Sequence, residues 1–109
     1  MKVSEFFPNY RRRVFKWAYE LQESTGKSWA VCLAKAWALY RLRRRMATET
    51  VQFSFEKADG SLRIALGTLV GSEELIKGTG KTNYKAMRYI DAETGVFKSF
   101  KIENFITAY

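Results

Sequence analysis

The segment from Val51 to Leu69 constrains the fold of this 109-residue chain more than any other stretch. Hydrophobic residues occupy every second position in two runs, one on each side of an Asp59-Gly60 turn. These residues are Val51, Phe53 and Phe55 before the turn and Leu62, Ile64 and Leu66 after it. This pattern predicts a β-hairpin with one apolar face. Because an isolated hairpin is only marginally stable in water, other strands or the preceding helical region must cover that face.

Length and composition limit the classes of protein to consider. With 47% hydrophobic and 16% aromatic residues, the chain is long enough for one compact domain, residues 1–109, and too short for two. It has one cysteine, Cys32, and no histidine, so we expect no internal disulfide, no metal and no cofactor. No apolar run approaches the roughly 18 residues of a membrane span, which leads us to expect a soluble, cytoplasmic protein.

Two helices are predicted before the hairpin. The first begins at a capping residue, Ser4 or Asn9, and ends at Gly26, while the second begins after the cap Ser28 and ends near Met46. Hydrophobic residues at helical spacing are Tyr10, Val14, Trp17, Ala18 and Leu21 in the first helix and Trp29, Leu33, Ala36, Trp37 and Tyr40 in the second. The short linker predicts an antiparallel helical hairpin. Such aromatic stripes favour a core role, with a stacking platform for bases as the alternative.

Three further strands are predicted after the hairpin. The first spans 84–91 and has Met87 and Tyr89 on one side. The second spans 96–102 and has Val96, Phe100 and Ile102 on one side. The third spans 107–109 and follows a helical turn at 103–106. Five short strands in hairpin order predict a small barrel that closes on itself and leaves no strand edge. We therefore expect an α+β fold in which a helical hairpin, residues 9–46, packs on a five-stranded antiparallel β-barrel, residues 50–109.

The positive charge is concentrated in the helical part. Residues 1–48 contain 11 basic and 3 acidic side chains and carry the whole net charge of +8, whereas residues 49–109 contain 8 of each. A one-sided excess of this kind attracts phosphates or an acidic protein surface. The predicted binding residues are Arg11, Arg12, Arg13, Lys16, Arg41, Arg43, Arg44 and Arg45, which an antiparallel helix pair should gather on one surface, together with Lys77, Lys81 and Lys85.

The positions of these arginines favour a binding role over a merely solvated one. Cations at a helix C-terminus complement the helix dipole, which accounts in part for Arg43 to Arg45, but the same dipole disfavours Arg11 to Arg13. We therefore predict non-enzymatic binding of nucleic acid, DNA or RNA, mainly through backbone phosphates. The alternative is a protein–protein interaction module or inhibitor that binds a host protein, such as an anti-defence protein of the anti-CRISPR kind.

Catalytic and nucleotide-binding motifs are weak in this sequence. The stretch Gly78 to Thr82 contains glycines and a lysine, but position 75, where a phosphate-binding loop has glycine, is Leu75, and a strand rather than a helix is predicted to follow. Cys32 lies in an apolar run, and the adjacent Glu73 and Glu74 are expected to be solvated. We therefore predict no enzymatic activity and no catalytic residue.

Several segments carry a family resemblance: 53–63, 67–69, 77–81, 89–91 and 97–105. Over residues 51 to 107 the chain resembles the small SH3-like β-barrel proteins frequent in gut Bacteroidetes genomes, their phages and their conjugative elements. Its layout is also similar to that of the WYL domain, although Met87-Arg88-Tyr89 stands where that domain has Trp-Tyr-Leu. The segment 28–37 is similar to a short helix common in phage-encoded proteins. The resemblance implies an SH3-like barrel and an origin in a mobile element, without an active site.

Overall fold

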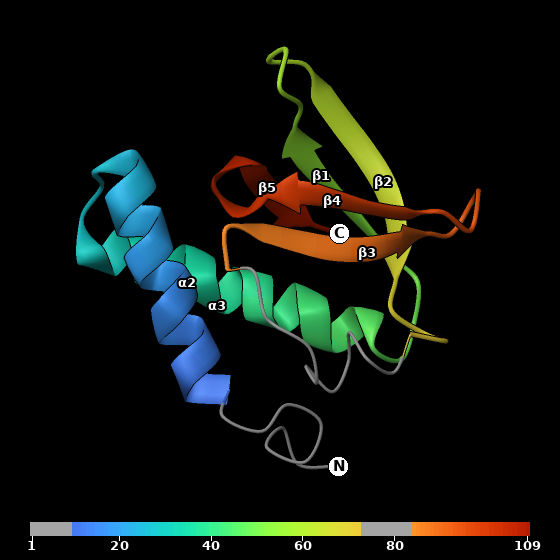
Figure 1. The fold of residues 1–109 in the computed structure, drawn as a ribbon, viewed down its shortest axis with the longest axis horizontal. Helices are drawn as coiled ribbons and strands as arrows, with labels where there is room; N and C mark the ends of the chain where they lie inside the picture. Colours follow the sequence, from blue (N-terminus) through green and yellow to red (C-terminus); the bar gives the residue numbers. More distant parts are fainter. Residues whose placement is uncertain (1–9, 73–83) are drawn as a thin grey trace.

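The fold is α+β, as predicted, with two helices followed by a five-stranded antiparallel sheet (Figure 1). The structure, a computed structural model, describes residues 10–72 and 84–109. The helices are α2 (Tyr10–Thr25) and α3 (Trp29–Met46), and a short 3₁₀ helix, η1, spans Ile102–Asn104. The strands are β1 (Val51–Glu56), β2 (Leu62–Thr68), β3 (Ala86–Asp91), β4 (Phe97–Lys101) and β5 (Phe105–Ala108). Neither of the described helices is long and apolar enough to cross a membrane.

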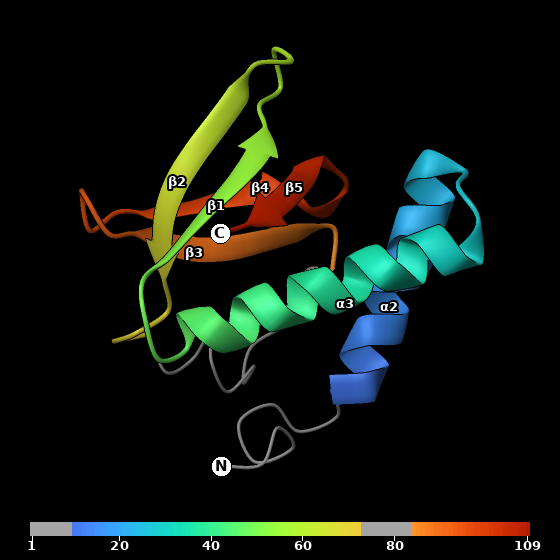
Figure 2. The same cartoon turned by 180° about the vertical axis from the view of Figure 1, so that it is seen from behind.

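The loop between the two helices follows the predicted end signals. Gly26 has a φ of +70°, a left-handed conformation that glycine adopts without strain, and its N–H bonds to the carbonyl of Gln22. The Ser28 hydroxyl accepts a hydrogen bond from the Val31 N–H at 3.3 Å, which confirms the predicted cap of α3. The proposed caps of the first helix, Ser4 and Asn9, lie outside the described residues. Figures 1 and 2 show that α2 and α3 cross obliquely.

The helical core is largely the predicted one. In α2 the buried residues are Val14, Trp17, Ala18 and Leu21, and in α3 they include Cys32, Ala36, Leu39, Tyr40, Leu42 and Met46. Trp37 is an exception, because its side chain remains 38% exposed, so its predicted place in the core is wrong. The buried residues of α3 already occupy the sides of the helix that face α2 and the sheet, and Trp37 projects from the remaining side.

The hairpin β1–β2 has a different register from the predicted one. The Lys57 N–H donates to the Ser61 carbonyl at 2.8 Å, so the loop has three residues rather than the two of an Asp-Gly turn. This shifts the pairing by one residue and places Phe53 opposite Ala65. Consequently Leu62, Ile64 and Leu66 lie on the outer face and are 59%, 50% and 36% exposed, and the prediction that they share the buried face with β1 is wrong.

The sheet has the strand order β4-β3-β2-β1-β5. Within the described residues, β4 and β5 do not pair, so the predicted closure that removes all strand edges is not found. The two strands are instead joined through η1, and the rings of Phe100 and Phe105 stack at 5.9 Å between centroids. The turn of the β1–β2 hairpin projects away from the helices, and α3 lies on the side of the sheet remote from that turn (Figures 1 and 2).

The ends of the last strands also differ from expectation. Strand β4 begins at Phe97, and Val96, predicted to share a buried face with Phe100, is 55% exposed in the turn before it. The predicted helical turn at 103–106 is a 3₁₀ helix one residue earlier, and β5 begins at Phe105 rather than Thr107. Met87 and Tyr89 of β3 are both buried, as predicted.

Aromatic side chains fill the space between the sheet and α3. The Phe53 ring contacts the rings of Tyr89 and Phe100, with centroid distances of 5.1 and 5.4 Å. This packing requires a glycine at position 67, because a Cβ there would lie 2.6 Å from a Phe53 ring carbon. The Leu69 N–H donates to the Met46 carbonyl at 2.8 Å and ties the end of β2 to α3.

Candidate functional site

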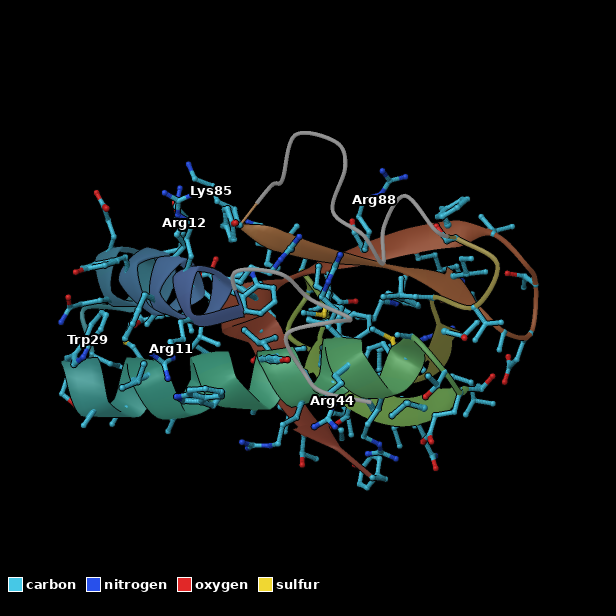
Figure 3. All side chains as sticks on the ribbon, turned by 90° about the horizontal axis from the view of Figure 1, so that it is seen from below. Arg11, Arg12, Trp29, Arg44, Lys85 and Arg88 are labelled. Atoms are coloured by element: carbon cyan, nitrogen blue, oxygen red, sulfur yellow. The ribbon has the colours of Figure 1, made fainter. Side chains whose placement is uncertain are left out.

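The three arginines at the start of α2 point in three directions. Consecutive residues of an α-helix are separated by about 100° around the axis. Figure 3 shows Arg11 on the side of α2 that faces α3 and Arg12 on the opposite side. The third residue, Arg13, lies near enough to Arg43 to lower its pKa. One run of sequence therefore supplies cations to three separate places.

The arginines at the end of α3 also differ from one another in their exposure to solvent. Arg41, Arg44 and Arg45 are exposed, whereas Arg43 is only 9% exposed. Arg45 forms an ion pair with Glu49 at 3.3 Å, which reduces its availability to a partner. The prediction that seven arginines and Lys16 share one surface is therefore wrong, because the helical rotation separates neighbouring residues and the two helices cross obliquely (Figure 1).

Arg13 and Arg43 join the two helices at a point of high positive charge. Burial, followed by the nearby Arg13, lowers the pKa of Arg43 to about 10, and Tyr84 acts in the opposite direction. Tyr84 also contacts Trp17 of α2 at 6.2 Å between ring centroids. The Arg43 guanidinium remains charged at neutral pH, so the fold holds two like charges together beside a phenol ring.

A second group of cations lies where α2 meets the start of β3. We name Arg12, Lys16, Lys85 and Arg88 the α2–β3 basic surface. Lys16 Nζ lies 5.4 Å from the Tyr84 ring centroid, which places the middle of α2 against the residue before Lys85. Figure 3 shows Arg12, Lys85 and Arg88 projecting on the same side of the molecule. Of the predicted residues, the fold thus brings together Arg12, Lys16 and Lys85.

A pocket of about 360 Å³ bounds this surface toward the end of α2. Its lining is mixed, with Lys85 just before β3, Lys101 at the end of β4, Glu20, Glu23 and Ser24 on α2, and Ile102 and Glu103 on η1. The carboxylates therefore mark the limit of the positive region along α2. Within the described ranges, no group of three or more acidic, cysteine or histidine side chains could hold a metal ion.

Two cations of the sheet, Lys98 and Arg63, share a structural partner. Asp91 is buried at the end of β3, where its carboxylate accepts from Lys98 Nζ at 2.7 Å and lies 3.6 Å from Arg63. The hydrogen bond from Lys98, followed by one from the Glu93 N–H, holds the pKa of Asp91 below its usual value. By contrast, Arg12, Arg13, Arg41 and Arg44 form no ion pair with any residue in the described segments. The predicted sites Lys77 and Lys81 lie outside those segments.

Sequence reasoning missed four surface residues: Phe15, Tyr19, Arg88 and Lys101. Arg88 stands over the Phe97 ring, with Cζ 5.3 Å from the centroid, and Lys101 lies opposite Ala86 on the neighbouring strand. The sequence contained a signal for the two aromatics, because Phe15 and Tyr19 follow Arg11 at successive four-residue intervals, off the stripe that forms the core. Only the rotation of the helix relative to its neighbours establishes that they are exposed.

Comparison with known proteins identifies the fold family. A family model described as WYL_2, Sm-like SH3 beta-barrel fold matches residues 39–106, which comprise the end of α3, strands β1 to β4 and the first half of β5. No curated protein and no solved structure matches the chain. Because the matched segment covers more than half of the sequence, the chain belongs to the WYL_2 family of Sm-like SH3 β-barrel folds.

Proposed function

We propose that this protein binds nucleic acid without catalysing a reaction, and that the α2–β3 basic surface and the Arg13–Arg43 pair contact backbone phosphates. The observation that carries the proposal is the gathering of like charges from α2 and α3 around Tyr84. Arginine and lysine neutralise phosphates and release the counterions condensed on a nucleic acid. Contacts of this type position the ligand and do not read its sequence.

The energetic cost of this arrangement supports the proposal. Helix α2 has no acidic residue in its first turn and no basic residue in its last, whereas Glu20 and Glu23 lie near its C-terminus. Each cation near an N-terminus opposes the helix dipole by about 0.3–1 kcal/mol. Arg13 adds a second unfavourable interaction by approaching the buried Arg43. A phosphate backbone would offset both effects by placing negative charge at the start of α2.

The test is a salt titration of nucleic-acid binding measured by fluorescence anisotropy. If about four phosphates are neutralised, the slope of log K against log salt concentration should be roughly −3 to −4. An affinity that is insensitive to salt would contradict the proposal. So would the absence of binding to both single-stranded and duplex oligonucleotides at low salt.

Charge-reversal variants locate the site. The double variant Arg12→Glu/Lys16→Glu should lose most of the affinity and should lower the magnitude of the salt slope by about two, since each phosphate contact contributes about one. Lys27→Glu/Lys57→Glu is a matched control, because it changes the net charge equally at two exposed positions away from this surface. Equal losses in the two variants would indicate a general charge effect and would contradict the assignment of the site.

The second candidate function is protein binding, in which the chain is a mobile-element protein that occupies a host protein. Exposure of Leu62, Ile64 and Leu66 on the outer face of the projecting hairpin favours it, because such side chains are buried by partners in many interfaces. A pull-down after nuclease treatment separates the two functions. Stoichiometric recovery of one host protein, lost in Ile64→Glu and retained in Arg12→Glu/Lys16→Glu, would support this candidate over the first.

A further inference from the structure

An exposed aromatic cluster lies where the start of α3 meets the middle of α2. The rings of Phe15 and Trp29 are nearly parallel, with an interplanar angle of 15° and a centroid distance of 6.3 Å. Tyr19 contacts the same indole at 4.9 Å. Phe15 and Tyr19 are 46% and 62% exposed, and Trp29 is partly buried. We name these three residues the aromatic platform.

The two exposed rings contact Trp29 at the edge of the helix pair, outside its buried core. The contact between α2 and α3 is already filled by buried residues such as Val14, Ala18 and Leu21 of α2 and Ala36 of α3. Phe15 and Tyr19 lie beside this core and leave about half of their surface in water, and together with Trp29 they form a contiguous exposed aromatic patch. Contiguous exposed apolar patches mark interaction sites on soluble proteins, whereas single exposed rings do not.

Positive charge adjoins the aromatic platform at one end. Arg11, Phe15 and Tyr19 are spaced four residues apart along α2, so they form a stripe on one side of the helix. Figure 3 shows Arg11 on the same side as Trp29, toward α3, and away from Arg12. Arg11 and the rings of Phe15 and Tyr19 therefore lie in sequence along one side of α2.

We propose that the aromatic platform stacks unpaired bases and that Arg11 holds the adjoining phosphate, which makes the preferred ligand a single-stranded nucleic acid. This inference rests on the proposed function and specifies its ligand. Stacking on aromatic side chains requires an accessible base face, which a duplex does not offer except at its ends. Because every base has such a face, the platform should tolerate any sequence. The strand then continues across the helix start to the α2–β3 basic surface.

The experiment compares a thymidine oligomer of about 12 nucleotides with a duplex of the same length, both read by fluorescence anisotropy at low salt. The wild-type protein should bind the single strand more tightly, and the tryptophan emission, to which Trp29 contributes, should be partly quenched on binding. Tyr19→Ala should weaken single-strand binding about fivefold or more and leave duplex binding unchanged. Tyr19→Trp should retain the affinity, since it keeps a ring of suitable size. The control Tyr109→Ala removes a tyrosine of similar exposure, 57%, from the C-terminus and should have no effect.

The results also distinguish failure of the inference from failure of the proposed function. If binding is salt-dependent but Tyr19→Ala and Phe15→Ala/Tyr19→Ala bind the single strand like the wild type, the inference is overturned and the proposed function stands. Equal or tighter binding of the duplex would overturn the inference in the same way. If neither oligonucleotide binds, the proposed function and the inference both fail. Circular dichroism of each variant establishes that a lost affinity is not a lost fold.

Discussion

Replacing Arg43 by methionine should stabilise the protein and weaken its binding to nucleic acid. Burial and the neighbouring Arg13 lower the pKa of Arg43 from the usual range of a guanidinium to about 10. This depression corresponds to roughly 3 kcal/mol by which the folded state disfavours the charged side chain at neutral pH. Methionine fills a similar volume without the charge, so Arg43→Met should raise the free energy of unfolding by about 1–3 kcal/mol.

The sign of this effect follows from proton binding. From about pH 10 up to the higher pKa of the unfolded chain, the unfolded chain binds more protons at Arg43 than the folded chain does, so this group makes stability rise with pH across that window. At neutral pH the full penalty is present, and urea denaturation there measures what the substitution removes. The wild-type and variant m-values should agree, which establishes that the change is one of stability.

Arg44→Met is the matched control for this prediction. Arg44 is exposed on the same turn of α3, so its replacement should change the free energy of unfolding by less than about 0.5 kcal/mol. A loss of more than about 1 kcal/mol in Arg43→Met would refute the reasoning, because it would mean that the folded state favours the charged side chain. Unchanged salt-dependent binding in Arg43→Met would remove the Arg13–Arg43 pair from the proposed site.

Three further substitutions test the fold. Gly67→Ala should destabilise the protein by about 1–3 kcal/mol in urea denaturation, because the new Cβ would lie 2.6 Å from a Phe53 ring carbon and 2.9 Å from a Tyr89 ring carbon. Ser28→Ala should cost about 1 kcal/mol through loss of the α3 cap, and Ser28→Asp should retain most of the stability. Asp91→Asn should lower the melting temperature at pH 7. Because the folded pKa of Asp91 is depressed, its stabilisation exists above the unfolded pKa and disappears on acidification, so the variant and wild type should converge as the pH falls through and below the unfolded pKa.

Local signals predicted most of the fold. The cap at Ser28, the helix end at Gly26 and the change from helical to alternating periodicity near residue 50 are properties of short segments, and each was correct. The faces of β2 were not predictable in this way. A loop of two or three residues at Asp59-Gly60 fits the sequence equally well, and the choice reverses which side chains of β2 are buried.

The candidate site was predictable only as a set of residues, not as a surface. Composition correctly marked the start of α2 and the end of α3 as basic. Their arrangement depends on the rotation of each helix and on the oblique crossing, which are determined by packing over the whole molecule. The burial of Arg43 and the exposure of Phe15 and Tyr19 are consequences of this packing. Two neighbouring aromatics such as Tyr19 and Trp17 therefore differ completely in environment, although their sequence contexts are similar.

The contrast between the two kinds of cation explains the uneven charge of the sequence. In the sheet, Arg63 and Lys98 share the buried carboxylate of Asp91, so these two cations are used within the fold. In the helices, Arg12 and Arg13 form no ion pair with any described residue. Reversing the charge of Arg12 should therefore have two separable effects. Stability should rise because a negative charge near the start of α2 is favoured by the helix dipole, and this gain is expected with or without a ligand. A loss of nucleic-acid affinity is expected only if Arg12 belongs to the proposed site, so an Arg12→Glu variant that gains stability and keeps its affinity would remove Arg12 from that site.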